Sequence, residues 1–183
     1  MNNKLKVKNI FAAVFEKSVL DELLEVLDSK TVKFWGTEGT VKYLKGKGFS
    51  AESIVDGFDF DGRVKSIDRK NFVRILADKS KGKHLAELKK NKLELLDLVI
   101  VDLYAPEKKN FPESMDVGGQ ALIRAAIKNY KNVGVAYDAK SIVDVTWELK
   151  KNGGLSLVFR RQLAKRALKF IARRASLEAS LFP

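Results

Sequence analysis

The feature that most constrains the fold is the segment from Asp97 to Leu103, whose core is a continuous apolar run. A strand with one solvated face alternates apolar and polar residues, whereas a strand buried on both faces reads as an unbroken apolar run. Such strands are typical of parallel sheets that helices cover on both sides. Further strands are expected over residues 7–15, 31–35, 53–55 and 133–137.

Segments with helical signals lie between and after these predicted strands. They predict helices over residues 20–27, from the turn at 36–40 to about 46, from 117, over 141–151, and from about 156. Strands that alternate with helices predict an α/β fold: a single three-layer domain over residues 1–183, with a mainly parallel sheet flanked by helices. In such sheets ligands bind at the carboxyl ends of the strands.

The composition excludes several classes of site. The chain of 183 residues has no cysteine, so disulfides, thiolate metal sites and a cysteine nucleophile are excluded. No apolar run approaches the length of a membrane span, and the basic N-terminus lacks the features of a signal peptide. We therefore expect a cytoplasmic protein without membrane contact. No His, Asp and Glu residues are grouped at metal-binding spacing, and we expect no metal and no other cofactor.

The net charge of +12 fits nucleic acid, an acidic membrane surface or a small anionic ligand. The densest basic run, between Arg160 and Arg174, has the pattern of an amphipathic helix. Its outward basic side carries Lys165, Arg166, Lys169 and Arg173. Aromatic residues do not interleave with the basic ones as a stacking platform for bases would require. We therefore expect a small anionic ligand and no nucleic acid.

The segment from Asp116 to Asn129 carries the strongest local signal of a ligand site. Asp116 occupies the N-cap position of a predicted helix. Gly118 and Gly119 would let an anion approach the free backbone N–H groups at the start of that helix. Lys128 lies about two and a half turns beyond Gly119, too far along the helix to belong to the same group of donors.

Three further segments follow predicted strands and would meet at the same edge of the sheet. The turn at 36–40 offers N–H groups and hydroxyls to a phosphate. The segment 61–66 places Arg63 and Lys65 two residues apart, so both side chains would point the same way if it is extended. Tyr104 ends the clearest strand. Taken alone, the turn is slightly better explained as structural and the basic pair is better explained as solvated side chains, while Tyr104 could reach a ligand or cap the core.

The order of these segments resembles that of a known family. D-G-R-V-K-S, D-L-Y and D-V-G-G-x-x-L-I-R-A-A-x-K-N are similar to G-R-V-K-T, N-L-Y and D-I-G-G-x-x-L-I-R-A-A-A-K-N of the IMP cyclohydrolase domain of the bifunctional purine-biosynthesis protein. The resemblance runs from near Phe11 to the C-terminus. It implies a methylglyoxal-synthase-like fold, a homodimer, and closure of the purine ring of 5-formamido-imidazole-4-carboxamide ribotide to give IMP and water.

The resemblance also implies roles for single residues. The catalytic residues would be Lys65, Tyr104, Asp116 and Lys128. The substrate-binding residues would be Lys17, Thr37, Gly39, Thr40, Arg63, Ser66, Asp102, Gly118, Gly119 and Asn129. The ligand would be a nucleotide, and the chemistry would require no metal or redox cofactor.

The chain departs from the family pattern near the expected site. Ala13 and Phe15 replace two serines, and Asp102 replaces an asparagine. Glu38 places a negative charge in the expected phosphate turn, and residues 67–74 lack two histidines, a proline and two glycines. These differences leave open a non-catalytic module for phosphorylated metabolites, and a methylglyoxal synthase remains a further alternative. The family's formyltransferase domain does not follow, so either a stand-alone enzyme or a fragment is expected.

Overall fold

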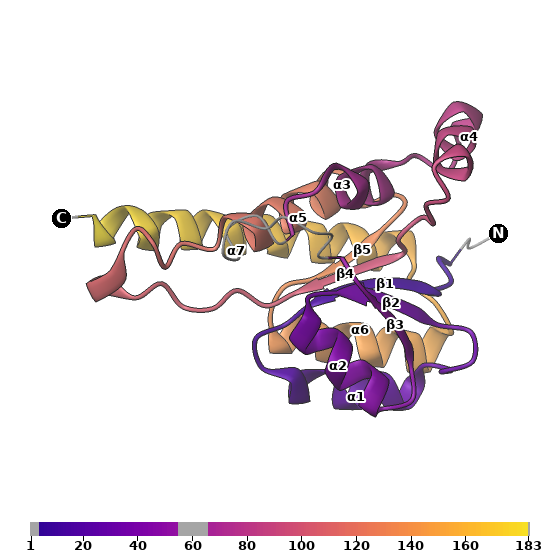
Figure 1. Cartoon of the computed structure of the whole chain (residues 1–183), viewed down its shortest axis with the longest axis horizontal. Helices are drawn as coiled ribbons and strands as arrows, with labels where there is room; N and C mark the ends of the chain where they lie inside the picture. Colours follow the sequence, from indigo (N-terminus) through magenta and orange to yellow (C-terminus); the bar gives the residue numbers. More distant parts are fainter. Residues whose placement is uncertain (1–3, 55–65, 183) are drawn as a thin grey trace.

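The computed structural model describes residues 4–54 and 66–182. At its centre is a sheet of five parallel strands in the order β3-β2-β1-β4-β5 (Figure 1). The strands are β1 (Asn9–Ala13), β2 (Lys33–Gly36), β3 (Ser50–Ser53), β4 (Leu98–Val101) and β5 (Gly134–Ala136). The register pairs Ile10 of the central strand with Phe34 and Leu98, and all three side chains are buried. The parallel sheet predicted from the apolar runs is confirmed.

Helices cover both faces of the sheet and make a three-layer α/β arrangement (Figure 1). One layer holds α1 (Asp21–Val26), α2 (Glu38–Gly46) and α6 (Ala139–Asn152). The opposite layer holds α3 (Arg69–Leu76), α5 (Val117–Lys128) and α7 (Leu157–Leu181). Helix α4 (Gly82–Lys90) projects beyond the second layer, and short 3₁₀ turns η1 (Lys17–Leu20) and η2 (Lys108–Asn110) complete the described elements.

The winding of the chain reverses at the centre of the sheet. From β1 the chain builds β2 and β3 on one side, and then returns to add β4 and β5 on the other side. Strands β1 and β4 are therefore the neighbours between which the direction changes. In open parallel sheets the crevice outside the carboxyl ends of such strands is the usual place for a ligand.

Two parts of the fold differ from the sequence prediction. Strand β3 ends at Ser53, where the predicted strand begins. It buries only Ala51, so its position depends on pairing with β2 and not on an apolar run of its own. The patterns predicted no elements where α3 and α4 form. Helix α4 consists mainly of polar and charged residues, whereas α3 is a short helix in which half of the residues are apolar.

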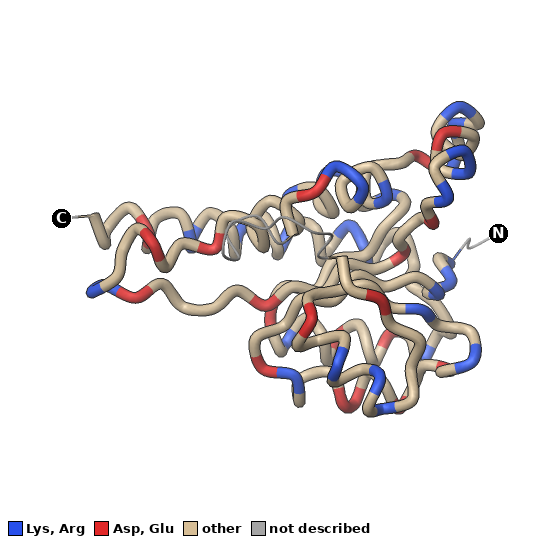
Figure 2. The backbone as a smooth tube through the Cα atoms, viewed as in Figure 1, with Lys and Arg blue, Asp and Glu red and all other residues tan. Residues whose placement is uncertain are grey.

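Helix α7 runs well past the end of the sheet (Figure 1). Its outward residues Lys165, Lys169 and Arg173 are exposed, as the amphipathic pattern predicts. Arg160 and Arg174, at the two ends of the same basic run, are instead buried. Figure 2 shows the other basic residues spread over most elements, with a dense group on α4. None of the helices in the described part of the chain combines the length and apolar character needed to cross a bilayer.

Candidate functional site

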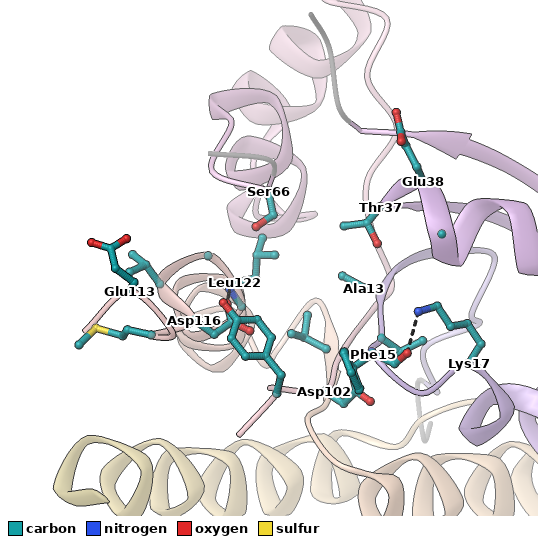
Figure 3. A pocket seen from close by; sticks show the side chains of 18 of the residues that line it. Ala13, Phe15, Lys17, Thr37, Glu38, Ser66, Asp102, Glu113, Asp116 and Leu122 are labelled. Atoms are coloured by element: carbon teal, nitrogen blue, oxygen red, sulfur yellow. Dashed lines mark hydrogen bonds between the residues drawn. The ribbon is translucent and has the colours of Figure 1, made fainter. Parts of the chain in front are cut away.

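A cavity of about 920 Å³ opens at the carboxyl ends of β1, β2 and β4. It lies where the winding of the sheet reverses, at the edge where a ligand site is expected. Its walls come from the loop after β1, the turn between β2 and α2, the residues after β4, and the start of α5 (Figure 3). The predicted site residues in these walls are Lys17, Thr37, Gly39, Ser66, Asp102, Tyr104, Asp116, Gly118 and Gly119.

Asp116 forms the N-cap of α5 and lines the cavity. Its Oδ1 accepts a hydrogen bond from the backbone N–H of Gly119 at 2.7 Å. Burial raises the pKa of Asp116 above its ordinary value of 3.8, and the hydrogen bond from Gly119 opposes this rise. A carboxylate with a raised pKa is a stronger base, so Asp116 is suited to take a proton from a weakly acidic group.

The two glycines after Asp116 are required by close packing at the start of the helix. A Cβ atom on Gly119 would lie 2.5 Å from Cδ2 of Leu103 and 2.7 Å from Oδ2 of Asp116. A Cβ atom on Gly118 would overlap Oγ of Ser66. The Ser66 hydroxyl therefore lies against the first turn of α5, where a helix leaves backbone N–H groups without intrahelical partners.

Tyr104 borders the same part of the cavity and is 41% exposed. Partial burial raises the pKa of its phenol, and the negative charge of Asp116 adds to this rise. The phenol therefore stays protonated near neutral pH and can donate a hydrogen bond or a proton.

The turn between β2 and α2 offers a second set of donors. Thr37 is the N-cap residue of α2, but its side chain makes no capping hydrogen bond and its hydroxyl lies 3.3 Å from that of Thr40. Thr40 is fully buried, and its Oγ1 lies 3.3 Å from the N and 3.4 Å from the O of Val14. Thr40 therefore holds the turn against the end of β1 from behind, while Thr37 and Gly39 line the cavity itself.

Lys17 brings a positive charge to this turn. Its Nζ donates a hydrogen bond to the carbonyl of Phe15 at 2.7 Å, and a Cβ atom on Gly39 would lie 3.6 Å from its Cε. Glu38 belongs to the same turn, but Figure 3 shows its carboxylate pointing away from the ammonium group of Lys17 and the hydroxyl of Thr37. The negative charge of Glu38 is thus directed away from these donors.

Asp102 links the two sides of the cavity. Its carboxylate accepts hydrogen bonds from the backbone N–H of Phe15 and, at 3.3 Å, from that of Glu16. Burial raises the pKa of Asp102, and both of these hydrogen bonds oppose the rise. Since each carboxylate oxygen accepts one backbone N–H, an asparagine here would match only one of the two donors.

Comparisons with known proteins assign the chain to a family. The sequence pattern of the MGS-like domain matches residues 20–136, more than half of the chain. The chain belongs to the MGS-like domain family. The crystal structure of ForH has a TM-score of 0.76 to this chain at 29% sequence identity. The match covers 97% of this chain and 99% of the ForH chain.

Curated relatives confirm the resemblance carried by the motifs. The bifunctional purine biosynthesis protein PurH of Clostridium botulinum (strain Hall) is 32% identical over 178 residues, which cover 91% of this chain and 36% of that protein. PurH of Clostridium perfringens (strain SM101) is 32% identical over 177 residues, which cover 90% of this chain and 35% of that protein. The chain thus spans about a third of the length of these relatives.

The structure of this MGS-like domain does not bring three of the predicted residues into the lining of the cavity: Thr40, which lies behind it, and Lys128 and Asn129. Lys128 ends α5 and Asn129 follows it, so both lie at the far end of a helix that rises about 1.5 Å per residue. Asn129 donates hydrogen bonds to the carbonyls of Ile75 and Ala77, at 2.7 and 2.9 Å, and so fixes the end of α3. Lys128 therefore does not line this cavity with Asp116, and the catalytic role expected for it stays a prediction.

Arg63 and Lys65 lie outside the described residues. Ser66, the next residue in the chain, lines the cavity. The roles expected for Arg63 and Lys65 stay predictions.

Three polar residues that support the cavity from behind were not expected from the sequence: Gln120 of α5, and Arg174 and Glu178 of α7. The basic composition around Arg174 predicts a solvated face, yet Arg174 and Glu178 are buried. Both continue the stripe of the buried residues Ala167 and Ile171 at intervals of three and four. This spacing is the signal that could have identified them.

Proposed function

We propose that the chain is an IMP cyclohydrolase, an enzyme of purine biosynthesis that closes the ring of 5-formamido-imidazole-4-carboxamide ribotide to give IMP and water. One observation carries this proposal: the carboxyl of Asp116, the phenol of Tyr104 and the donors of the turn at Thr37 line one cavity. Similarity to PurH over 91% of the chain supports the same class of substrate.

The proposed reaction joins the carboxamide nitrogen of the substrate to its formyl carbon. This nitrogen is a weak nucleophile and must lose a proton as it attacks, and Asp116 takes that proton. The formyl oxygen gains negative charge, which the predicted cation Lys65 stabilises. A second proton leaves the formamido nitrogen as the carbon–oxygen bond breaks, and the oxygen departs as water. Tyr104, whose phenol stays protonated, donates to this oxygen. Lys128 has no part in this scheme.

The 5′-phosphate of the substrate binds, in this proposal, at the start of α2. Helix N-termini favour anions because their first N–H groups lack intrahelical partners and the helix dipole is positive there. Thr37 adds a hydroxyl, and Lys17 adds a positive charge above Gly39. Ser66 and the predicted residue Arg63 then position the base beside the first turn of α5.

We further propose a cytoplasmic homodimer that requires no metal or organic cofactor and binds neither nucleic acid nor membranes. The family resemblance supports the dimer, and the spread of basic residues over many elements (Figure 2) supports a role of the charge in solubility. Sedimentation at high protein concentration tests the dimer, and a monomer there would contradict it.

The direct test offers the formylated ribotide to the purified protein and measures IMP formation. Asp116→Asn preserves a good N-cap but cannot take up a proton, so turnover should fall by about 10²–10⁴-fold. Asp138→Asn is the matched control, because Asp138 caps α6 through Ser141 at 2.7 Å and does not line the cavity. Equal turnover by the two variants would remove Asp116 from the mechanism.

A second candidate function is a non-catalytic module that binds phosphorylated metabolites. Phe15 favours it: this side chain is 72% exposed and lines the cavity where the resembling family carries a serine. Such a module would bind IMP but leave the formylated ribotide unchanged. Calorimetry with IMP, run beside the turnover assay, distinguishes the two candidates.

A further inference from the structure

The end of helix α7 contains a buried ion pair directly behind the candidate site. Arg174 Nε and Glu178 Oε1 lie 2.8 Å apart, and each side chain is only 8% exposed. In Figure 1 this part of α7 extends past the sheet, beside the segment that connects β4 to α5. The cavity wall that holds Tyr104 and Asp116 is therefore backed by a pair of opposite charges.

Each partner of the ion pair also contacts one element of this wall. Nη2 of Arg174 donates a hydrogen bond to the backbone carbonyl of Tyr104. The two carboxylate oxygens of Glu178 accept hydrogen bonds from Nε2 of Gln120, at 2.9 and 3.1 Å. Gln120 lies in the first turns of α5, the helix that Asp116 caps. The pair thus connects the segment that bears Tyr104 to the helix start that bears Asp116.

We propose that Arg174 and Glu178 are positioning residues of the active site, which hold Tyr104 and Asp116 at a fixed separation and set the charge around Asp116. This inference rests on the proposed function, since it deepens the account of the same cavity.

Stability of the helix does not by itself account for the pair. Ala167 and Ile171, on the same stripe of α7, are buried and apolar. Apolar residues at the two later positions would also pack, without the cost of removing two charges from water. What apolar residues cannot supply is directional hydrogen bonds to the carbonyl of Tyr104 and the amide of Gln120. A positioning role explains why a charged pair occupies this place.

The pair also acts on the ionisation of Asp116. In the described part of the chain, the charged and titratable groups around it are Asp102 and Tyr104 after β4, Glu113 before α5, and Arg174 and Glu178 on α7. Burial is the main cause of the raised pKa of Asp116. The positive charge of Arg174 opposes the rise, and the negative charge of Glu178 adds to it. The two partners therefore shift the pKa of Asp116 in opposite directions.

Titration of the Asp116 carboxyl, followed by carbon NMR in the full chain with labelled aspartate, tests this inference without any need for turnover. Asp116→Asn identifies the signal by its loss. Arg174→Met removes a positive charge and should raise the titration midpoint of Asp116. Glu178→Gln removes a negative charge and should lower it. A purely structural role would shift both variants in the same direction, so equal or absent shifts would overturn the proposal.

A second ion pair, between α7 and α6, offers matched controls. Arg166 pairs with Asp144 at 2.7 Å, and neither residue lines the cavity. Arg166→Met and Asp144→Asn should leave the midpoint of Asp116 where it is in the wild type. Shifts as large as those of the buried pair would mean that the midpoint reports general changes in α7, which would overturn the proposal.

Arg174→Lys separates position from charge, and it remains informative if Arg174→Met does not fold. A lysine keeps the positive charge, so the midpoint of Asp116 should stay close to wild type. Its single ammonium group lacks the planar fork that reaches both Glu178 and the carbonyl of Tyr104. We expect kcat to fall by on the order of 10²-fold, as for a displacement of about 1 Å, with KM almost unchanged.

The outcomes separate this inference from the proposed function. A wild-type kcat in Arg174→Lys would overturn the positioning role. If the wild-type protein forms no IMP while the midpoint shifts in opposite directions, the proposed function fails and the assignment of the pair to Asp116 stands.

Discussion

The two walls of the cavity are built in different ways. The turn wall consists of Lys17, Thr37 and Gly39, with Thr40 behind it, and the helix wall consists of Tyr104, Asp116, Gly118 and Gly119. A contact between the start of α2 and the end of β1 holds the turn wall, since Thr40 bonds to the backbone of Val14. Contacts with the far end of the chain hold the helix wall, since Arg174 binds the carbonyl of Tyr104 across 70 positions of sequence.

This difference matches what each wall has to do. An anion can be bound by backbone N–H groups and hydroxyls, which a strand, a turn and a helix start supply from one stretch of sequence. A proton transfer requires a group with a tuned pKa, and tuning needs burial and charges from other parts of the fold. Burial of Asp116, with Arg174 and Glu178 nearby, provides both.

The largest expected effect comes from adding one methyl group to the helix wall. In Gly119→Ala the new Cβ would lie 2.5 Å from Leu103 and 2.7 Å from the carboxylate of Asp116, so Asp116 must move. A displacement of about 1 Å of a reacting group commonly costs about 10²-fold in turnover. Steady-state kinetics measures this loss.

Gly46→Ala is the matched control for this substitution. No atom lies within 4 Å of the position of its Cβ, and Gly46 ends helix α2. We expect unchanged turnover and a gain of about 0.4–1 kcal/mol in the free energy of unfolding. Near wild-type turnover in Gly119→Ala would show that catalysis tolerates a displacement of Asp116. The helix wall would then need no more precise positioning than the turn wall.

A smaller effect is expected from the support of the turn wall. Thr40→Val keeps the shape of the side chain but leaves the backbone groups of Val14 without their partner. A buried group left unpaired costs about 1–3 kcal/mol in the free energy of unfolding, and IMP binding should weaken as the turn loosens.

Thr37→Val removes a hydroxyl that lines the cavity, so it should weaken IMP binding with little change in the free energy of unfolding. Urea unfolding and calorimetry measure the two quantities. A fall in kcat without a change in IMP affinity would contradict a phosphate-binding role of this wall.

The parts of the site that the sequence predicts are the locally encoded ones. Asp116 with its glycines, and the turn around Thr37, follow apolar strands, and parallel strands bring their ends to one edge. The ion pair of Arg174 and Glu178 is missed because the basic composition around Arg174 predicts a solvated face, although the spacing of both residues continues the buried stripe of α7. The catalytic role of Lys128 is expected from the resemblance alone, and the structure places Lys128 at the opposite end of the three-turn helix α5 from Asp116.

The smallest expected effect concerns the pH dependence of stability, and it tests whether the charge environment of the helix wall is unusual. Burial raises the pKa of Asp116 above 3.8 in the folded protein, so the folded state binds this proton more tightly than the unfolded chain. The contribution of Asp116 to the free energy of unfolding is therefore greatest below about pH 3.8, and it is lost as the pH rises through the raised value. As the pH rises from about 3 to about 7, the free energy of unfolding of Asp116→Asn should therefore increase relative to that of the wild type.

The pKa of Asp78 is shifted in the opposite direction from that of Asp116, so its effect on the pH dependence of stability has the opposite sign. Its side chain accepts hydrogen bonds from Ser80, which lower the pKa of Asp78 below 3.8. Its contribution is present above that value and is lost as the pH falls, so Asp78→Asn should become less stable than wild type over the same rise in pH. Urea unfolding of both variants at the two pH values gives the comparison. Opposite pH trends of the two variants would support the view that the surroundings of Asp116 in the helix wall disfavour its ionised form. A trend in Asp116→Asn that follows Asp78→Asn would mean that Asp116 is stabilised as an anion, and the proton-accepting role proposed for it would lose its physical basis.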